Sequence, residues 1–453
     1  MRKNIIRLLG IALIAVILAV SCGMSGSSSS SISGTPGGRP GSGPGSGHGP
    51  GSSASSITYS GAVEISTSET QSGQTYASST TDESALLVST SDAVTIENPT
   101  VTKSGSSDGG DSCNFYGLNA AVLVKGGSTT TITGGTITSD ASGANGVFSY
   151  GGNGGSNGSS GDGTTVIISG TTITTTGSGS GGIMTTGGGI TKAYDLTVTT
   201  SGQSSAAIRT DRGGGTVTVD GGTYTSNGLG SPAIYSTADI TVENATLVSN
   251  LSEGVCIEGK NSITLIDCDL TATNTKCNGN AKFLDTIMIY QSMSGDADSG
   301  TSSFTMTGGK LTSNKGHVFH VTNTNAVINL SGVEIVNNDG DVLLSVCDDG
   351  WSGASNIATL NASGQDLSGT ILVGSDSTFT LNLKDGSTFT GTFSGNITNA
   401  AGSTVSTSVG TVNVTIGSTS TWVLTEDTYV SSLTNNGTLD RNGHTLYVNG
   451  VAY

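Results

Sequence analysis

Residues 216–270 of this 453-residue chain read TVTVDGGTYTSNGLGSPAIYSTADITVENATLVSNLSEGVCIEGKNSITLIDCDL. Three segments of this stretch share the pattern Φ-x-Φ-x-x-s-x-Φ, in which Φ is mostly apolar and s is often small. The pattern falls on Val217, Val219, Gly222 and Tyr224, on Ile240, Val242, Ala245 and Leu247, and on Ile263, Leu265, Cys268 and Leu270. Successive copies are 23 residues apart. Apolar residues at every second position predict short strands, and a fixed period of this length predicts a solenoid.

The same pattern extends in both directions, from residue 130 to residue 367. A second short strand precedes each copy, as in GGIM, AAIR, PAIY and GVCI. One coil cannot bury its apolar side chains alone, whereas stacked coils form a continuous core. A sandwich of hairpins, the alternative all-β fold, requires no fixed period. We therefore predict an all-β fold, a single-stranded right-handed parallel β-helix over residues 57–453 with terminal caps, the C-terminal cap at 421–453. Right-handedness follows the general preference of crossover connections. We expect the outward positions to be mainly Thr, Ser and Asn.

The N-terminal segment has the features of an export signal. Residues 1–22 read MRKNIIRLLGIALIAVILAVSC, with basic residues first and then an apolar run too short to span a membrane comfortably. The end of this segment resembles a bacterial lipobox, in which Cys22 is lipidated and becomes the mature N-terminus. An ordinary secretory signal is the alternative. Residues 23–56 are rich in Gly, Ser and Pro, a composition typical of a flexible linker. The sequence predicts a lipid-anchored domain presented on a bacterial cell surface.

Composition excludes several classes of protein. The chain has 16 basic and 33 acidic residues, a formal charge of −17, and no basic cluster, which argues against a nucleic-acid partner. Its 71 glycines, together with many Ser and Thr, exclude a long helical bundle. Five cysteines remain beyond Cys22, and we expect most of them to be buried and structural.

The repeat is interrupted mainly at one place in the coil. Insertions at 149–163, 209–215, 290–300 and 347–353 all follow the first strand of a coil and precede the Φ-x-Φ strand. They are therefore expected to emerge along one edge of the solenoid. Insertions gathered on one edge of a repeat protein commonly form its binding face.

This edge carries the candidate functional residues. Aromatic side chains beside polar groups suit sugar rings, and carboxylates in glycine-containing loops suit Ca²⁺. Solvated loop residues are the alternative, and Trp351 in particular has the alternative role of covering the core. The candidate ligand-binding residues are Tyr290, Trp351, Arg212, Glu258 and Gln291, and the candidate calcium ligands are Asp296, Asp298, Asp348 and Asp349.

Enzymes with the predicted fold provide a comparison for the charged residues of this edge. Pectate lyases with this fold combine calcium-binding aspartates with a basic residue, for which Arg212 and Lys260 are the candidates. The GHG motif of polygalacturonases is not found within the predicted β-helix, residues 57–453. We predict a protein without enzymatic activity and leave polysaccharide lyase activity open.

Two stretches of the sequence resemble adhesin-like β-helix proteins of bacterial and archaeal surfaces. The first begins SPAIYSTADITVENATLVSN and continues to residue 274, and the second is STWVLTEDTYVSSLTNNGTLDRNGHTLYVNG from residue 420. The resemblance implies adhesion or ligand binding, with a host or environmental glycan or a surface protein as partner. A weaker resemblance is to β-helical carbohydrate-binding domains with a repeated Asp-Asp-Gly-Φ motif, present here once at 348–351. It implies the alternative function, a carbohydrate-binding module for acidic polysaccharides that depends on calcium.

Overall fold

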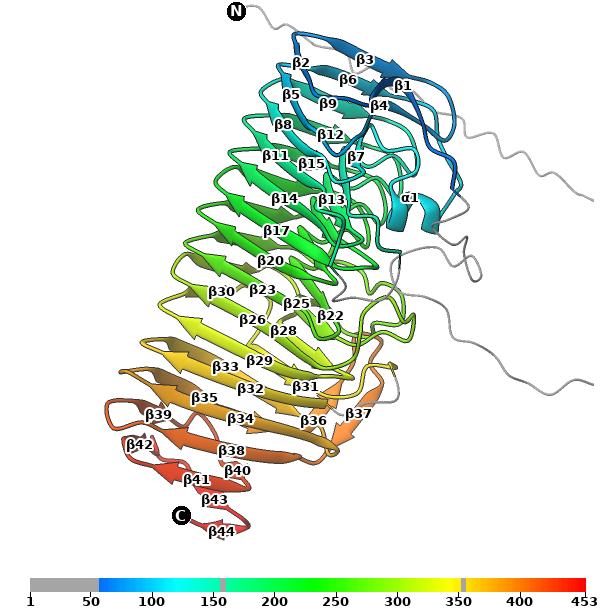
Figure 1. Cartoon of the computed structure of the whole chain (residues 1–453). Helices are drawn as coiled ribbons and strands as arrows, with labels where there is room; N and C mark the ends of the chain where they lie inside the picture. The colour runs from blue at the N-terminus through cyan, green and yellow to red at the C-terminus, as the bar shows by residue number, and fades with distance from the viewer. Residues whose placement is uncertain (1–56, 155–159, 352–355) are drawn as a thin grey trace, which may run out of the picture. The chain divides into compact units, whose positions relative to one another are not determined.

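A computed structural model describes residues 57–154, 160–351 and 356–453 of the chain. This part of the protein is a parallel β-helix (Figure 1), as the sequence predicts. Each complete coil passes through three sheets, which we name A, B and C in the order in which the chain visits them. The segments predicted as signal peptide, lipidation site (Cys22) and linker lie outside the described residues.

Sheet A has 15 strands, sheet B has 14 and sheet C has 10. Sheet A contains β1 (Ser60–Ile65), β4 (Glu83–Ser89), β7 (Val122–Lys125), β10 (Val147–Tyr150), β13 (Ile183–Thr186), β16 (Ile208–Thr210), β19 (Ile234–Ser236), β22 (Val255–Glu258), β25 (Asp285–Tyr290), β28 (His317–Thr322), β31 (Val342–Val346), β33 (Asp366–Val373), β35 (Thr388–Ser394), β39 (Thr421–Val423) and β42 (Thr438–Asp440). Sheet B contains β2 (Glu69–Ser72), β5 (Ala93–Glu97), β8 (Thr129–Thr133), β11 (Thr165–Ser169), β14 (Gly189–Tyr194), β17 (Gly215–Asp220), β20 (Asp239–Glu243), β23 (Ser262–Ile266), β26 (Thr301–Thr307), β29 (Asn325–Ser331), β32 (Asn356–Ser363), β34 (Ser377–Lys384), β38 (Thr411–Ile416) and β41 (Ser432–Asn435). Sheet C contains β3 (Thr75–Ser78), β6 (Thr100–Lys103), β9 (Thr136–Ser139), β12 (Thr172–Thr175), β15 (Thr197–Thr200), β18 (Thr223–Ser226), β21 (Thr246–Ser249), β24 (Asp269–Ala272), β27 (Lys310–Ser313) and β30 (Glu334–Asn337).

The remaining elements are short. Helix α1 (Asp111–Tyr116) lies between β6 and β7. An antiparallel pair is formed by β36 (Asn396–Thr398) and β37 (Thr404–Thr407), and a small sheet by β40 (Thr428–Val430), β43 (Leu446–Val448) and β44 (Val451–Ala452). None of the described helical residues forms a span long and apolar enough to cross a membrane.

The register of the strands confirms the 23-residue repeat. Val217 pairs with Ile240, which pairs with Ile263, and all three side chains are buried. The second apolar position repeats in the same way through Val219 and Val242. These rows form one continuous core along the stack, because neighbouring coils place equivalent residues directly over each other.

The turn from sheet B to sheet C explains the small residue of the repeat. The first turn residue adopts a left-handed conformation, with φ of 54° at Asn244 and 74° at Gly221. Asn and Gly tolerate this conformation better than other residues. The second turn residue is the s position, where Ala245 and Cys268 are buried against the core.

The outward positions differ between the sheets. Outward side chains of sheets B and C are mainly Thr, Ser and Asn, as expected. The outward row of sheet A contradicts the expectation, because it runs through Leu87, Leu123, Phe148 and Met184, all of them buried. This row continues to Cys256 and Met288. The apolar side chains on this outer face are covered by α1, by residues 277–283 and by β36–β37. Each of these segments packs against the face and forms a satellite cluster with it, giving three clusters.

The cross-section of the coil changes towards the C-terminus. Sheet C ends at β30, and the described coils that follow add strands to sheets A and B, of which β32 to β35 are seven or eight residues long. Residues 421–453 extend sheets A and B to their last strands and then form the small sheet with β40 (Figure 1). Trp422 of this segment is fully buried, and its Nε1 donates to the Gly391 carbonyl at 3.1 Å. That this segment acts as a cap remains a prediction.

Candidate functional site

All four insertions lie at the turn from sheet A to sheet B, as predicted. They follow β10, β16, β25 and β31 and precede β11, β17, β26 and β32. They therefore emerge along one edge of the β-helix, which we call the loop edge. The shorter insertion around Lys276 to Lys282 lies at a different turn, from sheet C to sheet A.

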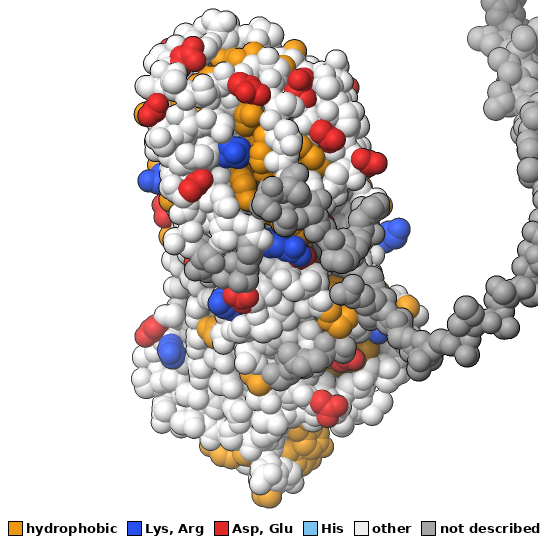
Figure 2. Space-filling view, turned by 45° about the vertical axis from the view of Figure 1, so that its right-hand side comes forward, with side chains coloured by type: hydrophobic (Ala, Val, Ile, Leu, Met, Phe, Trp, Pro, Cys, Tyr) orange, Lys and Arg blue, Asp and Glu red, His pale blue; other side chains and the backbone are white. Residues whose placement is uncertain are grey.

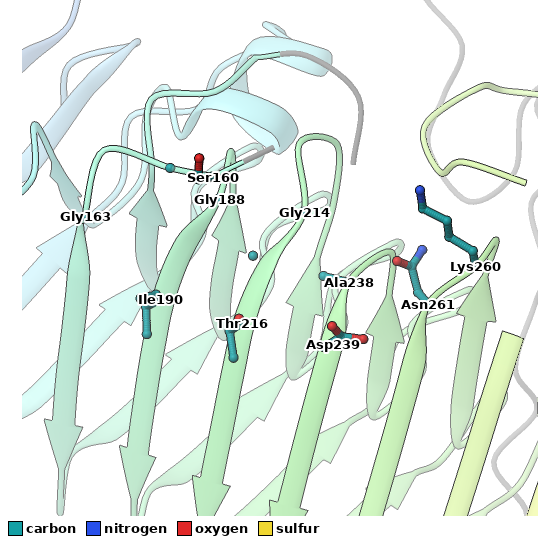
Figure 3. A pocket seen from close by; sticks show the side chains of 12 residues that line it. Ser160, Gly163, Gly188, Ile190, Gly214, Thr216, Ala238, Asp239, Lys260 and Asn261 are labelled. Carbon is teal, nitrogen blue, oxygen red and sulfur yellow. The ribbon is translucent and has the colours of Figure 1, made fainter. Parts of the chain in front are cut away.

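A groove of about 520 Å³ follows the loop edge (Figure 3). Its lining comes from five successive coils, those that enter sheet B at β11, β14, β17, β20 and β23. The lining residues are Ser160, Gly161, Gly163, Gly188, Ile190, Gly214, Gly215, Thr216, Ala238, Asp239, Lys260 and Asn261. The groove is thus built mainly from backbone and small polar side chains.

Glycine is required where the loops of the groove pass closest to one another. A Cβ atom on Gly161 would lie 2.3 Å from the Gly188 carbonyl oxygen, a distance that real structures do not contain. Gly188 itself has a φ of 79°, in the left-handed region. Its amide donates to the Gly214 carbonyl at 3.0 Å. Tightly stacked glycine turns therefore bring backbone groups to the surface of the groove.

Two charged side chains reach the groove, and they have opposite sign. Lys260 Nζ lies 3.0 Å from Asp298, and both side chains are partly exposed. Asp239 is exposed and accepts a hydrogen bond from Ser262 Oγ at 2.6 Å. Figure 3 shows Lys260 and Asn261 at one end and Ser160 and Gly163 at the other. The groove is therefore close to neutral.

A second network lies on the outer face of sheet A, beneath the loop edge. Arg212 forms an ion pair with Asp296, with Nη2 at 2.5 Å and Nε at 3.1 Å from the same carboxylate oxygen. Its guanidinium carbon also lies 4.4 Å from the centre of the Phe115 ring of α1. These contacts join the 290–300 loop to helix α1, so Arg212 stabilises the loop rather than standing free for a ligand.

Arg209 and Asp211 form the buried part of this network. Their ion pair is 2.6 Å long, and both side chains are almost fully buried. Burial raises the pKa of Asp211 to about 7, although the neighbouring Arg209 lowers it in part. Sequence analysis did not identify this pair, because a charged residue at an outward position of a strand is ordinarily exposed.

Glu258 is the centre of a set of hydroxyl groups. It accepts hydrogen bonds from Tyr235 Oη at 2.5 Å, from Tyr290 Oη at 3.0 Å and from the Ser292 hydroxyl. Burial raises the pKa of Glu258, and the hydrogen bonds from Ser292 and Tyr235 lower it. Because Glu258 is 2 % exposed, it fixes the start of the 290–300 loop and does not reach the groove surface.

The prediction that the aromatic side chains of Tyr290 and Trp351 are available to a sugar ring is wrong, because both are buried. Tyr290 is 2 % and Trp351 4 % exposed, and their ring centres are 5.1 Å apart. Both belong to a satellite cluster with Tyr235 and Met288. Gln291 is also buried, and its side chain donates to backbone carbonyls of its own loop. These side chains cover the apolar outer face of sheet A, which the sequence pattern did not reveal.

The four aspartates predicted to bind calcium do not converge. Asp296 and Asp298 are paired with different cations, Arg212 and Lys260. Asp349 is buried, where it accepts the Lys282 amide at 2.5 Å and lies 3.4 Å from His320 Nε2, whereas Asp348 accepts the Gly350 amide. Within the described ranges, no three His, Cys, Asp or Glu side chains are placed to hold a metal together. Separate ion pairs and hydrogen bonds hold the four aspartates in different places, which prevents the predicted grouping.

Comparisons with models of protein families, with curated proteins and with solved structures gave no match for this chain.

Proposed function

We propose that this protein is a cell-surface lipoprotein whose β-helix acts as an adhesin-type binding module for an extended glycan. The groove along the loop edge is the observation that carries the proposal, because it runs across five coils and is lined by backbone, hydroxyl and amide groups. Small-ligand sites are ordinarily compact concave pockets, whereas this groove extends across five coils.

The length of the groove favours a polymer over a small molecule. The lining strands are consecutive members of sheet B, and neighbouring strands are ~4.8 Å apart. Five coils therefore extend over roughly 19 Å. Successive coils offer similar backbone groups at a constant interval, an arrangement suited to a ligand with a repeating unit.

The charge of the groove favours a neutral chain over an acidic one. Lys260 is offset by Asp298 and Asp239, and the chain as a whole carries −17. On the face that Figure 2 shows, basic and acidic side chains are scattered and form no basic patch. An acidic polysaccharide would meet unfavourable long-range electrostatics at such a surface.

We propose binding without catalysis. A lyase of the kind considered above needs a basic residue free to abstract a proton beside metal-binding carboxylates. Arg212 and Lys260 are each held by an aspartate, and the groove lining contains Asp239 as its only carboxylate. Presentation at the cell surface follows from the leader and linker sequences, and we propose attachment of a lipid to Cys22.

The binding proposal is tested with a glycan array probed with the purified protein. Thr216→Trp places a large side chain in the groove, and Thr218→Trp, also exposed on β17 but outside the groove, is the matched control. We expect binding to neutral polysaccharides, a loss of at least about tenfold in affinity for Thr216→Trp, equivalent to ~1.4 kcal/mol, and no comparable loss for the control. Absence of any glycan ligand, or equal effects of both variants, would contradict the proposal.

Surface attachment has a separate test. Cells expressing the chain are labelled with a fatty acid analogue, and the protein is then recovered from the membrane fraction. Cys22→Ser is expected to abolish labelling and to release the protein from the membrane. Labelling that persists in this variant would show that the lipid is attached elsewhere or that the signal is of another type.

A further inference from the structure

Two carboxylates are stacked on adjacent coils at the turn from sheet C to sheet A. The Gly254 amide donates to the Thr286 carbonyl at 2.8 Å, and Val255 pairs with Ile287. Glu253 and Asp285 therefore occupy equivalent positions on neighbouring coils, ~4.8 Å apart along the stack. Glu253 is 3 % exposed and Asp285 is fully buried.

The Asp285 carboxylate has no hydrogen-bond partner on either oxygen, although it is completely buried. Asn274 provides a second, independent observation at the same place. Its Nδ2 donates to the Asp285 backbone carbonyl at 3.2 Å, and its side chain is also hydrogen-bonded to Glu253. The Asn274 amide nitrogen thus contacts both acid residues, and its Oδ1 is buried without a partner.

Burial raises the pKa of both acids, and no basic side chain in the described part of the chain balances their charge when they are ionised. None of the lysines and arginines in the described residues forms an ion pair with Glu253 or Asp285. The buried carboxylate of Asp349 is near enough to repel that of Asp285. On the next coil, His317 lies beside Asp285 in the strand register, but its Nδ1 is hydrogen-bonded to Ser345 Oγ at 2.7 Å. Buried carboxylates without a counter-charge are costly, so such groups are ordinarily paired or coordinate a metal.

We propose that Glu253, Asp285 and Asn274 bind a divalent cation of the calcium type between two coils. The two carboxylates provide oxygen ligands, which hard cations prefer, and together they match a charge of +2. Further oxygens, from water or backbone carbonyls, complete the coordination. This site lies at the C-to-A turn, away from the groove at the A-to-B turn, and it does not include the aspartates that the sequence suggested. It is independent of the proposed glycan binding.

The experiment uses the full chain, freed of metal by dialysis against a chelator and then titrated with Ca²⁺ by calorimetry. We expect one bound Ca²⁺ per chain and a rise in the melting temperature on its addition. Asp285→Asn is expected to abolish both effects. Asp298→Asn, which alters a partly exposed aspartate of the loop edge, is the control and is expected to retain them.

A milder variant covers the case in which Asp285→Asn does not fold. Asn274→Ala keeps both carboxylates and removes the unpartnered amide oxygen, and we expect at least a threefold weaker calcium affinity. The proposal is overturned if the native protein binds no Ca²⁺ at millimolar concentration, which would indicate that protons neutralise the acids. It is equally overturned if Asp298→Asn, and not Asp285→Asn or Asn274→Ala, removes calcium binding.

Discussion

Replacement of Trp351 by alanine separates a structural role of this residue from a role in ligand binding. The indole is 4 % exposed and packs at 5.1 Å from the Tyr290 ring in the satellite cluster that covers sheet A. Truncation of a buried Trp typically costs about 3–5 kcal/mol. The Trp351 Nε1 is buried without a hydrogen-bond partner, and removal of such a group recovers ~1–3 kcal/mol. We therefore expect Trp351→Ala to lower the free energy of unfolding by roughly 2 kcal/mol.

The assay is urea unfolding followed by far-UV circular dichroism, because fluorescence would change with the loss of the indole itself. Tyr194→Ala is the control, since Tyr194 is 41 % exposed and its removal is expected to change stability by less than about 0.5 kcal/mol. Trp351→Phe is expected to keep most of the packing and most of the stability. A Trp351→Ala protein that is as stable as the native chain, but has lost binding to a glycan, would refute the reasoning.

Three further predictions concern buried charges and thiols. Burial raises the pKa of Asp211 to about 7, so between ~pH 4, its ordinary pKa, and this value the folded state holds a proton that the unfolded state has released. The free energy of unfolding should therefore fall as pH rises through this window, and Asp211→Asn should flatten the slope in pH-dependent urea titrations. A double-mutant cycle on Arg212 and Asp296, which are partly buried, should give a coupling of ~1 kcal/mol that weakens in high salt; no coupling at low salt would contradict the ion pair. The described cysteines are all free, and only Cys277 is partly exposed, with burial raising its pKa to about 11. Thiol reagents at mild alkaline pH should thus label this residue slowly in the folded protein and the other four only after denaturation, as mass spectrometry can show.

Sequence analysis located the candidate site better than it identified the residues that form it. The four insertions define the loop edge, and their position follows directly from the interruptions of the repeat. Tyr290, Trp351 and Gln291 were expected on its surface and are buried instead. One signal of this burial was available, because strands such as DTIMIY carry apolar residues at both parities and so need cover on both faces.

The pairing of charged residues was beyond sequence analysis. Asp296 forms an ion pair with Arg212, which is 84 residues away along the chain. Glu253 lies near enough to Asp285, across an insertion, for the two acids to repel each other. Which charges meet is decided by how the loops fold over neighbouring coils, and the spacing of the insertions carries no information on that. The sequence therefore indicated exposed loop aspartates as calcium candidates and carried no signal for the buried acids at the C-to-A turn.

The sequence by itself determined that this chain is a parallel β-helix, because strand alternation and the 23-residue period are local properties that repeat wherever a coil is formed. It also determined the left-handed backbone at the B-to-C turn, because Asn, Asp or Gly stands there and these residues tolerate that conformation. Only the tertiary structure decided which outward side chains are covered. That outcome depends on inserted segments that pack across several coils, and their contacts join residues for which the repeat imposes no regular spacing.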